Sequence, residues 1–183
     1  TFTDGEIIYE AGDPPGGIYG VVSGAVRISF VPRERSPVFA HYFRIGSWFG
    51  EAAALSGQPR LAGHSASGDT ELLHLPIKGV NELIRADPAC LRFFSILTYG
   101  HLQTALGATA DLMIRDHVKR FIATLLRLGG CREATQSGER LIEVCISQDE
   151  LAAMANVART TANSILRRLQ RHGLVKITYR RID

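Results

Sequence analysis

A segment near the C-terminus places hydrogen-bonding side chains at a spacing that suits contact with nucleic acid. Ser147 and Glu150 form a capping box, in which each side chain can bond the other residue's amide, so they predict the start of a helix. Asn156 tolerates the left-handed backbone of a tight turn. A second helix is then predicted from Arg159 to Arg171, terminated by Gly173. The pattern is that of a helix-turn-helix.

The outer face of this second helix carries side chains that can bond base edges and phosphates. Residues 174–182 follow as a predicted β-hairpin wing with a basic tip, incomplete at the C-terminus. The inner face of the motif is expected to be Leu151, Ala155, Val157, Ala162, Ile165 and Leu169. The predicted contacts to double-stranded DNA are Ser147, Arg159, Thr160, Thr161, Asn163, Ser164, Arg167, Lys176 and Arg180.

The charge distribution agrees with a polyanionic partner for this end of the chain. The whole chain has a net charge of +3, yet residues 147–183 alone hold seven Lys or Arg and only three Asp or Glu. The remainder is therefore close to neutral. A basic segment on a near-neutral body favours nucleic acid as the partner of that segment.

Other kinds of chemistry find no support in the pattern. No Ser/His/Asp arrangement, metal-ligand cluster or P-loop is present, so the chain is not expected to be an enzyme or to hold a metal. Cys90, Cys131 and Cys145 lack the spacing of a zinc site or a disulfide framework and are expected to be reduced thiols. No apolar run approaches the ~20 residues of a membrane span. A cytoplasmic protein without a membrane partner is expected, whose N-terminal segment is missing.

The elements that must position the DNA-contacting residues begin with β-structure. Short apolar runs separated by Gly, Pro and Asp predict strands over residues 1–80. From Pro88 the period becomes helical, and one apolar stripe continues along a long helix over residues 89–113. The stripe consists of Leu91, Phe94, Thr98, Leu102, Ala105, Thr109 and Leu112. Either a second subunit covers this stripe, which favours a homodimer, or the helix packs along its own domain.

The predicted fold is therefore of the α+β class in three parts. Residues 1–88 form an N-terminal double-stranded β-roll (jelly-roll-like), residues 89–114 the dimerisation helix, and residues 115–183 the winged helix-turn-helix. Within the last part, a helix is expected over residues 116–128 and a strand over 141–146.

At this point the chain resembles the CRP/FNR family of transcription regulators over essentially its whole length. The matching pattern is Gly5-Glu6, Gly12-Asp13, Tyr19, Ser23-Gly24, Val26, Gly46, Phe49-Gly50-Glu51 and Pro59-Arg60, followed by the winged helix-turn-helix. The resemblance implies a cyclic-nucleotide-binding-like sensor domain and a homodimer that binds an inverted-repeat operator. It also implies RNA polymerase as a partner.

The resemblance places a candidate effector site in the sensor domain. Its residues are Gly50, Glu51, Arg60, Leu61, Ala62, His101, Ala105 and Leu106. In cyclic-AMP-binding members the Glu holds the ribose and the Arg the phosphate, but Leu61 stands here where those members carry a hydroxyl residue. Ala105 and Leu106 likewise replace Thr and Ser. Cyclic AMP is thus expected to bind weakly or not at all, which leaves another small molecule, or no effector and a structural Glu51–Arg60 ion pair.

Two further sensor types that occur in the family are not supported. An iron–sulfur sensor needs a cysteine cluster, and none is visible. A haem sensor needs axial ligands, and His41, His64, His74 and His101 each stand alone in the sequence. The cofactor is left unknown.

The recognition helix also departs from the family pattern. Members that read TGTGA half-sites carry Arg-Glu-Thr-x-x-Arg, whereas this chain keeps Arg159 but has Thr160 and Ser164 for the Glu and the second Arg. One guanine per half-site is expected under Arg159, with a different sequence elsewhere. The alternative function is a cyclic-nucleotide-gated regulatory or anchoring subunit whose C-terminal helices bind protein, which would require an acidic or apolar face on residues 159–171.

Overall fold

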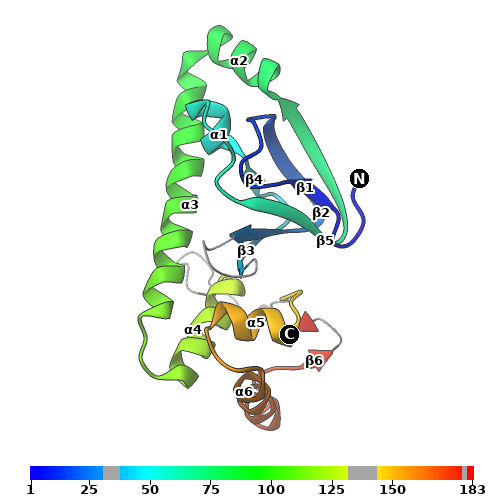
Figure 1. The fold of residues 1–183 in the computed structure, drawn as a ribbon, viewed down its shortest axis with the longest axis vertical. Coiled ribbons are helices and arrows are strands. Elements are labelled where there is room, and N and C mark those ends of the chain that lie inside the picture. Colours follow the sequence, from blue (N-terminus) through cyan, green and yellow to red (C-terminus); the bar gives the residue numbers. More distant parts are fainter. Residues whose placement is uncertain (31–37, 132–143, 179–180) are drawn as a thin grey trace. The chain divides into compact units, whose positions relative to one another are not determined.

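The computed structural model describes residues 1–30, 38–131, 144–178 and 181–183 (Figure 1). The chain divides into two compact units, Thr1–Thr104 and Ala105–Asp183. The described elements confirm the α+β class: a β-sheet domain, then a long helix, then a helix-turn-helix with a small hairpin. Half of the predicted strand at 141–146, residues 141–143, lies outside the described residues, as does Arg180; in the other half Val144 forms an isolated bridge with Ile182. None of the described helices is both long and apolar enough to cross a membrane.

An antiparallel sheet forms the body of the first unit. Its strands are β1 (Ile7–Tyr9), β2 (Gly17–Phe30), β3 (Val38–Phe43), β4 (Trp48–Phe49) and β5 (Gly63–Pro76). They run in the order β1-β5-β2-β3, and β4 pairs with β2. The two long strands, β2 and β5, pair along almost their whole length with register shifts near the middle. Such bulges increase the local twist of a strand pair and bend it.

Helices complete the first unit: α1 (Glu51–Ser56), α2 (Ile77–Ala86), a 3-10 turn (Pro88–Cys90) and α3 (Leu91–Leu112). Helix α2 corrects the sequence analysis, which expected strands up to residue 80. It follows β5 directly after Pro76, and no side chain caps its first turn. The sequence therefore lacked the polar residue that usually marks a helix start.

Two apolar clusters hold the first unit together. One lies within the sheet and contains Tyr9, Val21, Val26, Phe43 and Phe49. The other joins the sheet to the helices and contains Ile18, Ala54, Val80, Cys90 and Phe94. Figure 1 shows α1 between the sheet and the first half of α3, where this second cluster forms.

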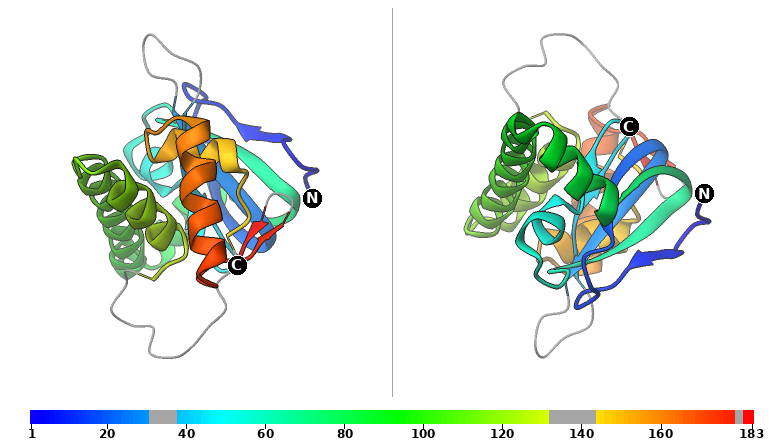
Figure 2. Two further views of the ribbon diagram at one scale, coloured as in Figure 1. Left: turned by 90° about the horizontal axis from the view of Figure 1, so that it is seen from below. Right: turned by 90° about the horizontal axis from the view of Figure 1, so that it is seen from above.

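The second unit contains α4 (His117–Leu128), α5 (Gln148–Met154), α6 (Arg159–Arg171), β6 (Ile177–Thr178) and β7 (Arg181–Ile182). Helix α6 has the predicted bounds, and α4 begins one residue later than predicted. The wing is confirmed as a short antiparallel hairpin. It lies beside the C-terminal end of α6 in the left view of Figure 2.

The core of the second unit lies where the three helices meet. Four of the six predicted inner-face residues are buried, namely Leu151, Ala155, Ala162 and Ile165, and Val157 and Leu169 are half-buried. Phe121 of α4 and Leu166 of α6 add to this core and are at most 1% exposed. Ala152 is 3% exposed, which agrees with a close crossing of α5 and α6. This core fixes the angle at which α6 is presented.

Candidate nucleic-acid interface and sensor site

The turn of the helix-turn-helix is built by local signals. Ser147 Oγ accepts from the Glu150 amide at 3.1 Å, and Glu150 Oε2 accepts from the Ser147 amide at 2.8 Å, so the capping box is complete. Asn156 has a φ of 49°, the left-handed conformation predicted for it. The Val157 amide then donates to the Ala152 carbonyl at 3.0 Å, and α6 begins two residues later.

A contact from α4 holds this turn, and the sequence analysis missed it. The Arg120 guanidinium donates to the carbonyls of Ala155 at 2.7 Å, Asn156 at 3.1 Å and Ile114 at 2.7 Å. Hydrogen bonds from a charged donor are stronger than neutral ones. Arg120 thus fixes the carbonyls of the turn to the segment before α4. No local pattern marks such a residue, because its partners are backbone atoms up to 36 residues away.

A second buried arginine fixes the end of α3 within the same unit. Arg127 Nε donates to Asp111 Oδ2 at 2.8 Å, and their side chains are only 10% and 1% exposed. A buried charge needs such pairing, since removing one partner leaves the other desolvated. The pair therefore attaches the C-terminal turn of α3 to α4.

The outer face of α6 is mostly open to solvent. Arg159, Thr160, Ser164 and Arg167 are exposed, as is Lys176 before the hairpin. The other predicted contacts differ: Thr161, Asn163 and Ser147 are half-buried. Asn163 Oδ1 lies out of solvent without a hydrogen-bond partner in the described part of the chain. The exposed side chains of this face can therefore reach a DNA groove without rearrangement.

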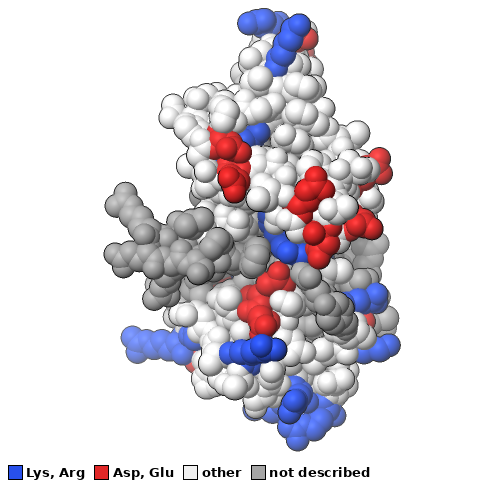
Figure 3. Space-filling view, turned by 45° about the vertical axis from the view of Figure 1, so that its right-hand side comes forward, with Lys and Arg blue, Asp and Glu red and all other residues white. Residues whose placement is uncertain are grey.

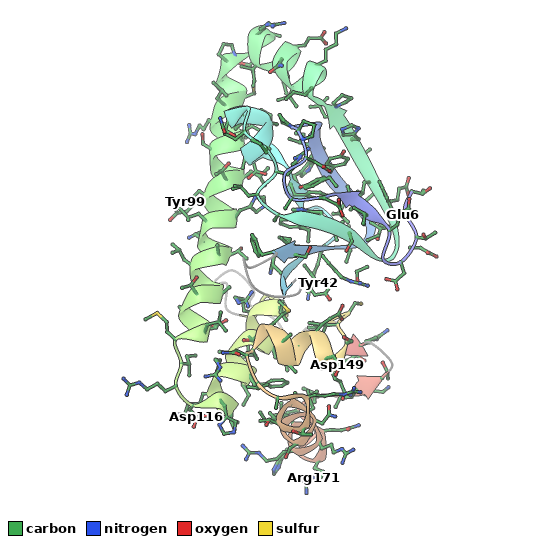
Figure 4. The ribbon with its side chains drawn as sticks, viewed as in Figure 1. Glu6, Tyr42, Tyr99, Asp116, Asp149 and Arg171 are labelled. Carbon is green, nitrogen blue, oxygen red and sulfur yellow. The ribbon has the colours of Figure 1, made fainter. Side chains whose placement is uncertain are left out.

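Positive charge gathers at the far end of α6. The last turn of α6 carries Arg168 and Arg171, both exposed, and the first turn of α6 holds no acidic residue. Figure 3 shows Lys and Arg side chains at the lower end of the view, and Figure 4 shows Arg171 extending from α6. The face is basic and polar, which disagrees with the acidic or apolar face that a protein-binding role would require.

Arg159 has an acidic neighbour on the preceding helix. Its Nε lies 2.8 Å from Oδ1 of Asp149, in the first turn of α5, and the two side chains are 72% and 57% exposed. The guanidinium is thus held by one bond while its other donors face solvent.

The sensor site differs from this open face because its charged groups are buried and bond other groups of the chain, although Arg60 Nε has no hydrogen-bond partner among the described residues. The Arg60 guanidinium donates to the carbonyls of Gly50 at 3.0 Å and Gly17 at 2.8 Å, and it lies 4.1 Å from the ring centre of Tyr9. Arg60 is 5% exposed. Gly50 has a φ of 96°, and a Cβ there would lie 2.6 Å from the guanidinium, so glycine is needed at this close approach.

Glu51 is bound by the long helix. Its Oε1 accepts from His101 Nδ1 at 2.8 Å and from Thr98 Oγ1 at 3.3 Å, both on α3. Glu51 is 2% exposed. The suggested Glu51–Arg60 ion pair was wrong: among the residues that the structure describes, Glu51 pairs with α3 and Arg60 with carbonyls. The pairing partner lies 50 residues along the chain, so no local pattern could predict it.

The sequence analysis treated each histidine of the first unit as isolated, but in the structure His64 and His74 contact other aromatic rings. His64 stacks on Phe49 at 4.9 Å between ring centres and also contacts Tyr9 at 4.5 Å. Burial, with a smaller contribution from the nearby Arg60 charge, lowers the pKa of His64 to about 4, so the ring is neutral at pH 7. His74 stacks on Tyr19 at 4.4 Å. The interior of the sheet is therefore filled by the chain's own aromatic rings.

The remaining candidate effector residues differ in their exposure to solvent. Ala62 is buried, whereas Leu61 is 81% exposed and points away from the interior. Ala105 and Leu106 lie on α3 just beyond the division between the two units, and both are exposed. In the described residues, no group of three His, Cys, Asp or Glu side chains could hold a metal ion.

The predicted dimerisation residues of α3 fall on two sides of the helix. Phe94 is 7% exposed and packs in the core of its own unit, and Thr98, which is itself exposed, bonds Glu51. The others, Leu91, Leu102, Ala105, Thr109 and Leu112, are exposed. Several large apolar residues outside the predicted stripe are also exposed, namely Phe93, Ile96, Tyr99 and Leu106. Figure 4 shows Tyr99 on the side of α3 away from the sheet.

A β-sheet domain followed by a helix-turn-helix with a basic, polar second helix and a wing defines a DNA-binding regulator. Residues 1–87 match the family described as cyclic nucleotide-binding domain, and residues 119–183 match the Crp-like helix-turn-helix domain. The chain belongs to the CRP/FNR family of transcription regulators, a non-enzymatic family, as the sequence predicted.

Known proteins of this family resemble the chain over most of its length. It is 25% identical over 169 residues to the cAMP-activated global transcriptional regulator CRP of Haemophilus influenzae, covering 92% of this chain and 75% of that protein. It is 28% identical over 185 residues to the transcriptional regulator SdrP of Thermus thermophilus, covering 100% of this chain and 87% of that protein. Among solved structures, FixK2 from Bradyrhizobium japonicum has a TM-score of 0.80 at 20% identity, with 99% and 88% of the two chains covered.

Proposed function

We propose that the protein regulates transcription as a homodimer on an inverted-repeat operator. The supporting observation is an exposed apolar stripe on α3. Tyr99, Leu102 and Leu106 are 61%, 53% and 60% exposed, and Thr109 and Met113 continue the same spacing of three and four residues. An apolar stripe at this spacing is the pattern of two packed helices. A second copy of α3 carries the same stripe and covers it.

This proposed dimer interface differs in part from the interface predicted from the sequence. Phe94 and Thr98 face their own unit, whereas Tyr99 and Leu106 stand on the open side of the helix. Contiguous exposed apolar groups of this kind mark an interaction surface.

Sedimentation of a charged variant tests the dimer. Replacing Leu102 and Leu106 with Glu places four carboxylates across the seam, and their desolvation and repulsion are expected to give monomers. Two acidic replacements on the exposed side of α2, Asn81→Glu with Ala86→Glu, serve as the matched control and are expected to stay dimeric. A dimeric L102E/L106E protein would refute this interface.

Each protomer reads one half-site with α6 in the major groove. Arg159 is exposed and grips one guanine through O6 and N7, while Arg167 and Lys176 contact phosphates. Thr160 and Ser164 are short and neutral, so a half-site other than TGTGA is expected. Two α6 helices related by a two-fold axis contact half-sites about one helical turn apart, or ~10 base pairs.

An effector at the sensor domain would act on α3 by competing for Glu51. The relatives' names point to different ligands: the Haemophilus influenzae protein is cAMP-activated, and a Xanthomonas campestris structure with a TM-score of 0.74 is named c-di-GMP responsive. In this chain the Glu51 carboxylate and the Arg60 guanidinium are already bonded. A cyclic nucleotide must break those bonds, so cyclic AMP is a poor ligand.

Calorimetry with cyclic AMP tests this part of the proposal. We expect no heat of binding, or a Kd weaker than about 1 μM, which corresponds to about −8 kcal/mol. Tighter binding would mean that Glu51 and Arg60 rearrange at little cost.

As a regulator of transcription, the protein would meet RNA polymerase on DNA in the cytoplasm. Co-purification with polymerase on operator DNA checks that partner.

A further inference from the structure

We infer that Asp149 is a positioning residue that sets the specificity of Arg159 for guanine. Asp149 Oδ1 lies 2.8 Å from Arg159 Nε, and the two residues come from different helices of the motif. The inference rests on the proposed reading of a guanine by Arg159.

The hydrogen bonds described at the start of α5 do not involve the Asp149 carboxylate. The capping box that starts α5 is made by Ser147 and Glu150. The remaining acid of residues 147–183, Asp183, pairs with Arg181 at the wing. Asp149 is thus an acid of the helix-turn-helix that bonds a residue of the proposed DNA-reading face.

The geometry of the pair leaves the useful edge of the guanidinium open. Arginine has five N–H donors in a planar fork, and the described contact to Asp149 is made at Nε. The side chain is 72% exposed, so donors on the Nη atoms are accessible to a ligand. Guanine O6 and N7 accept two parallel bonds from such an edge. Asp149 therefore restrains the orientation of Arg159 without occupying the atoms that read the base.

The charge of Asp149 acts on DNA of any sequence. Affinity for DNA in general comes from cations that neutralise phosphates. A carboxylate beside Arg159 cancels much of its charge at long range, so Arg159 gains little from phosphates alone. A restrained fork gains most from the one base that matches it, because less side-chain freedom is lost on binding. Both effects raise the ratio of affinity for the operator to affinity for other DNA.

The test compares two duplexes with the full-length protein. One is the operator recovered by selection, and the other has the guanine under Arg159 changed to dA in both half-sites. Binding constants are measured at two salt concentrations for wild type, Asp149→Asn, Arg159→Ala and the double variant. Glu71→Gln removes the same charge at an exposed position of the sensor unit and is the control.

Asp149→Asn is expected to lower the ratio of the two affinities by about three- to tenfold, a range consistent with an exposed ion pair. Most of the change should be tighter binding to the altered duplex. Arg159→Ala should bring the ratio close to 1, and the double variant should add nothing further. Glu71→Gln should leave the ratio unchanged.

Two failures are distinguishable. An unchanged ratio in Asp149→Asn, together with a collapsed ratio in Arg159→Ala, overturns the inference and leaves the reading of guanine by Arg159 intact. An unchanged ratio in Arg159→Ala overturns that proposed reading and the role of Asp149 with it. An equal fall in Glu71→Gln also overturns the inference, because net charge alone would then explain the effect.

Discussion

Two of the arginines that the sequence analysis assigned to binding, Arg60 and Arg159, are placed in opposite ways. Arg60 of the sensor unit is 5% exposed, donates to two backbone carbonyls and lies over Tyr9. The Arg159 side chain is 72% exposed and is held by one exposed carboxylate. Both match a family motif, yet only Arg159 has donors open to a ligand. A motif therefore identifies a residue type, and burial and bonding decide whether that residue is available.

The largest expected effect separates these arginines by stability. Arg60→Met keeps the length of the side chain but leaves the Gly17 and Gly50 carbonyls without their donor, which should lower the free energy of unfolding by about 2–5 kcal/mol. Arg159→Ala should change it by less than about 0.5 kcal/mol, as surface substitutions usually do. Trp48, the only tryptophan of the chain, lies in the sensor unit and reports its unfolding in urea by fluorescence. A stable Arg60→Met protein would show that Arg60 is there for a ligand.

The next largest effect concerns the stability at low pH of the first unit, whose interior contains the buried His64 ring. The folded-state pKa of His64 is about 4, below the unfolded value of 6.5, because the ring is buried. The stability that this neutral ring provides is present above pH 6.5 and is lost as the pH falls from there to about 4. The linked loss between pH 7 and pH 4 is roughly 2–3 kcal/mol.

His64→Phe should remove that part of the acid sensitivity of the sensor unit. The exposed histidine variant His117→Gln should keep the wild-type pH profile. Urea unfolding followed at Trp48 between pH 4 and pH 7 measures both. An unchanged profile in His64→Phe would contradict the filling of the interior by a neutral His64.

The comparison also explains what could be predicted from the sequence. The helix-turn-helix was predicted residue by residue because its signals are local. A capping box at Ser147, a left-handed turn at Asn156 and a stop at Gly173 each act within a few residues. The exposed side chains of α6 follow from helical periodicity once its first residue is known.

Most of the missed features depend on residues that are distant in sequence. The bonds of Glu51 to α3 and of Arg120 to the turn join segments 35 to 50 residues apart. Phe94 was assigned to the dimer seam because an apolar stripe of α3 looks the same whether it faces its own core or a second copy. Helix α2 has no capping side chain and follows an apolar strand, so nothing local separated the two elements.

The central claim is that the α6 face of a dimer reads DNA through Arg159. Selection from a random pool of duplexes, run with wild type, Arg159→Ala and Arg167→Ala and without added nucleotide, tests it most directly. Wild type should recover an inverted repeat, distinct from TGTGA, with one guanine per half-site. Arg159→Ala should lose preference at that base pair, at a cost of about 1–3 kcal/mol, whereas Arg167→Ala should keep the sequence and bind all DNA more weakly. Identical recovered sequences from wild type and Arg159→Ala, or a single half-site from wild type, would contradict the account.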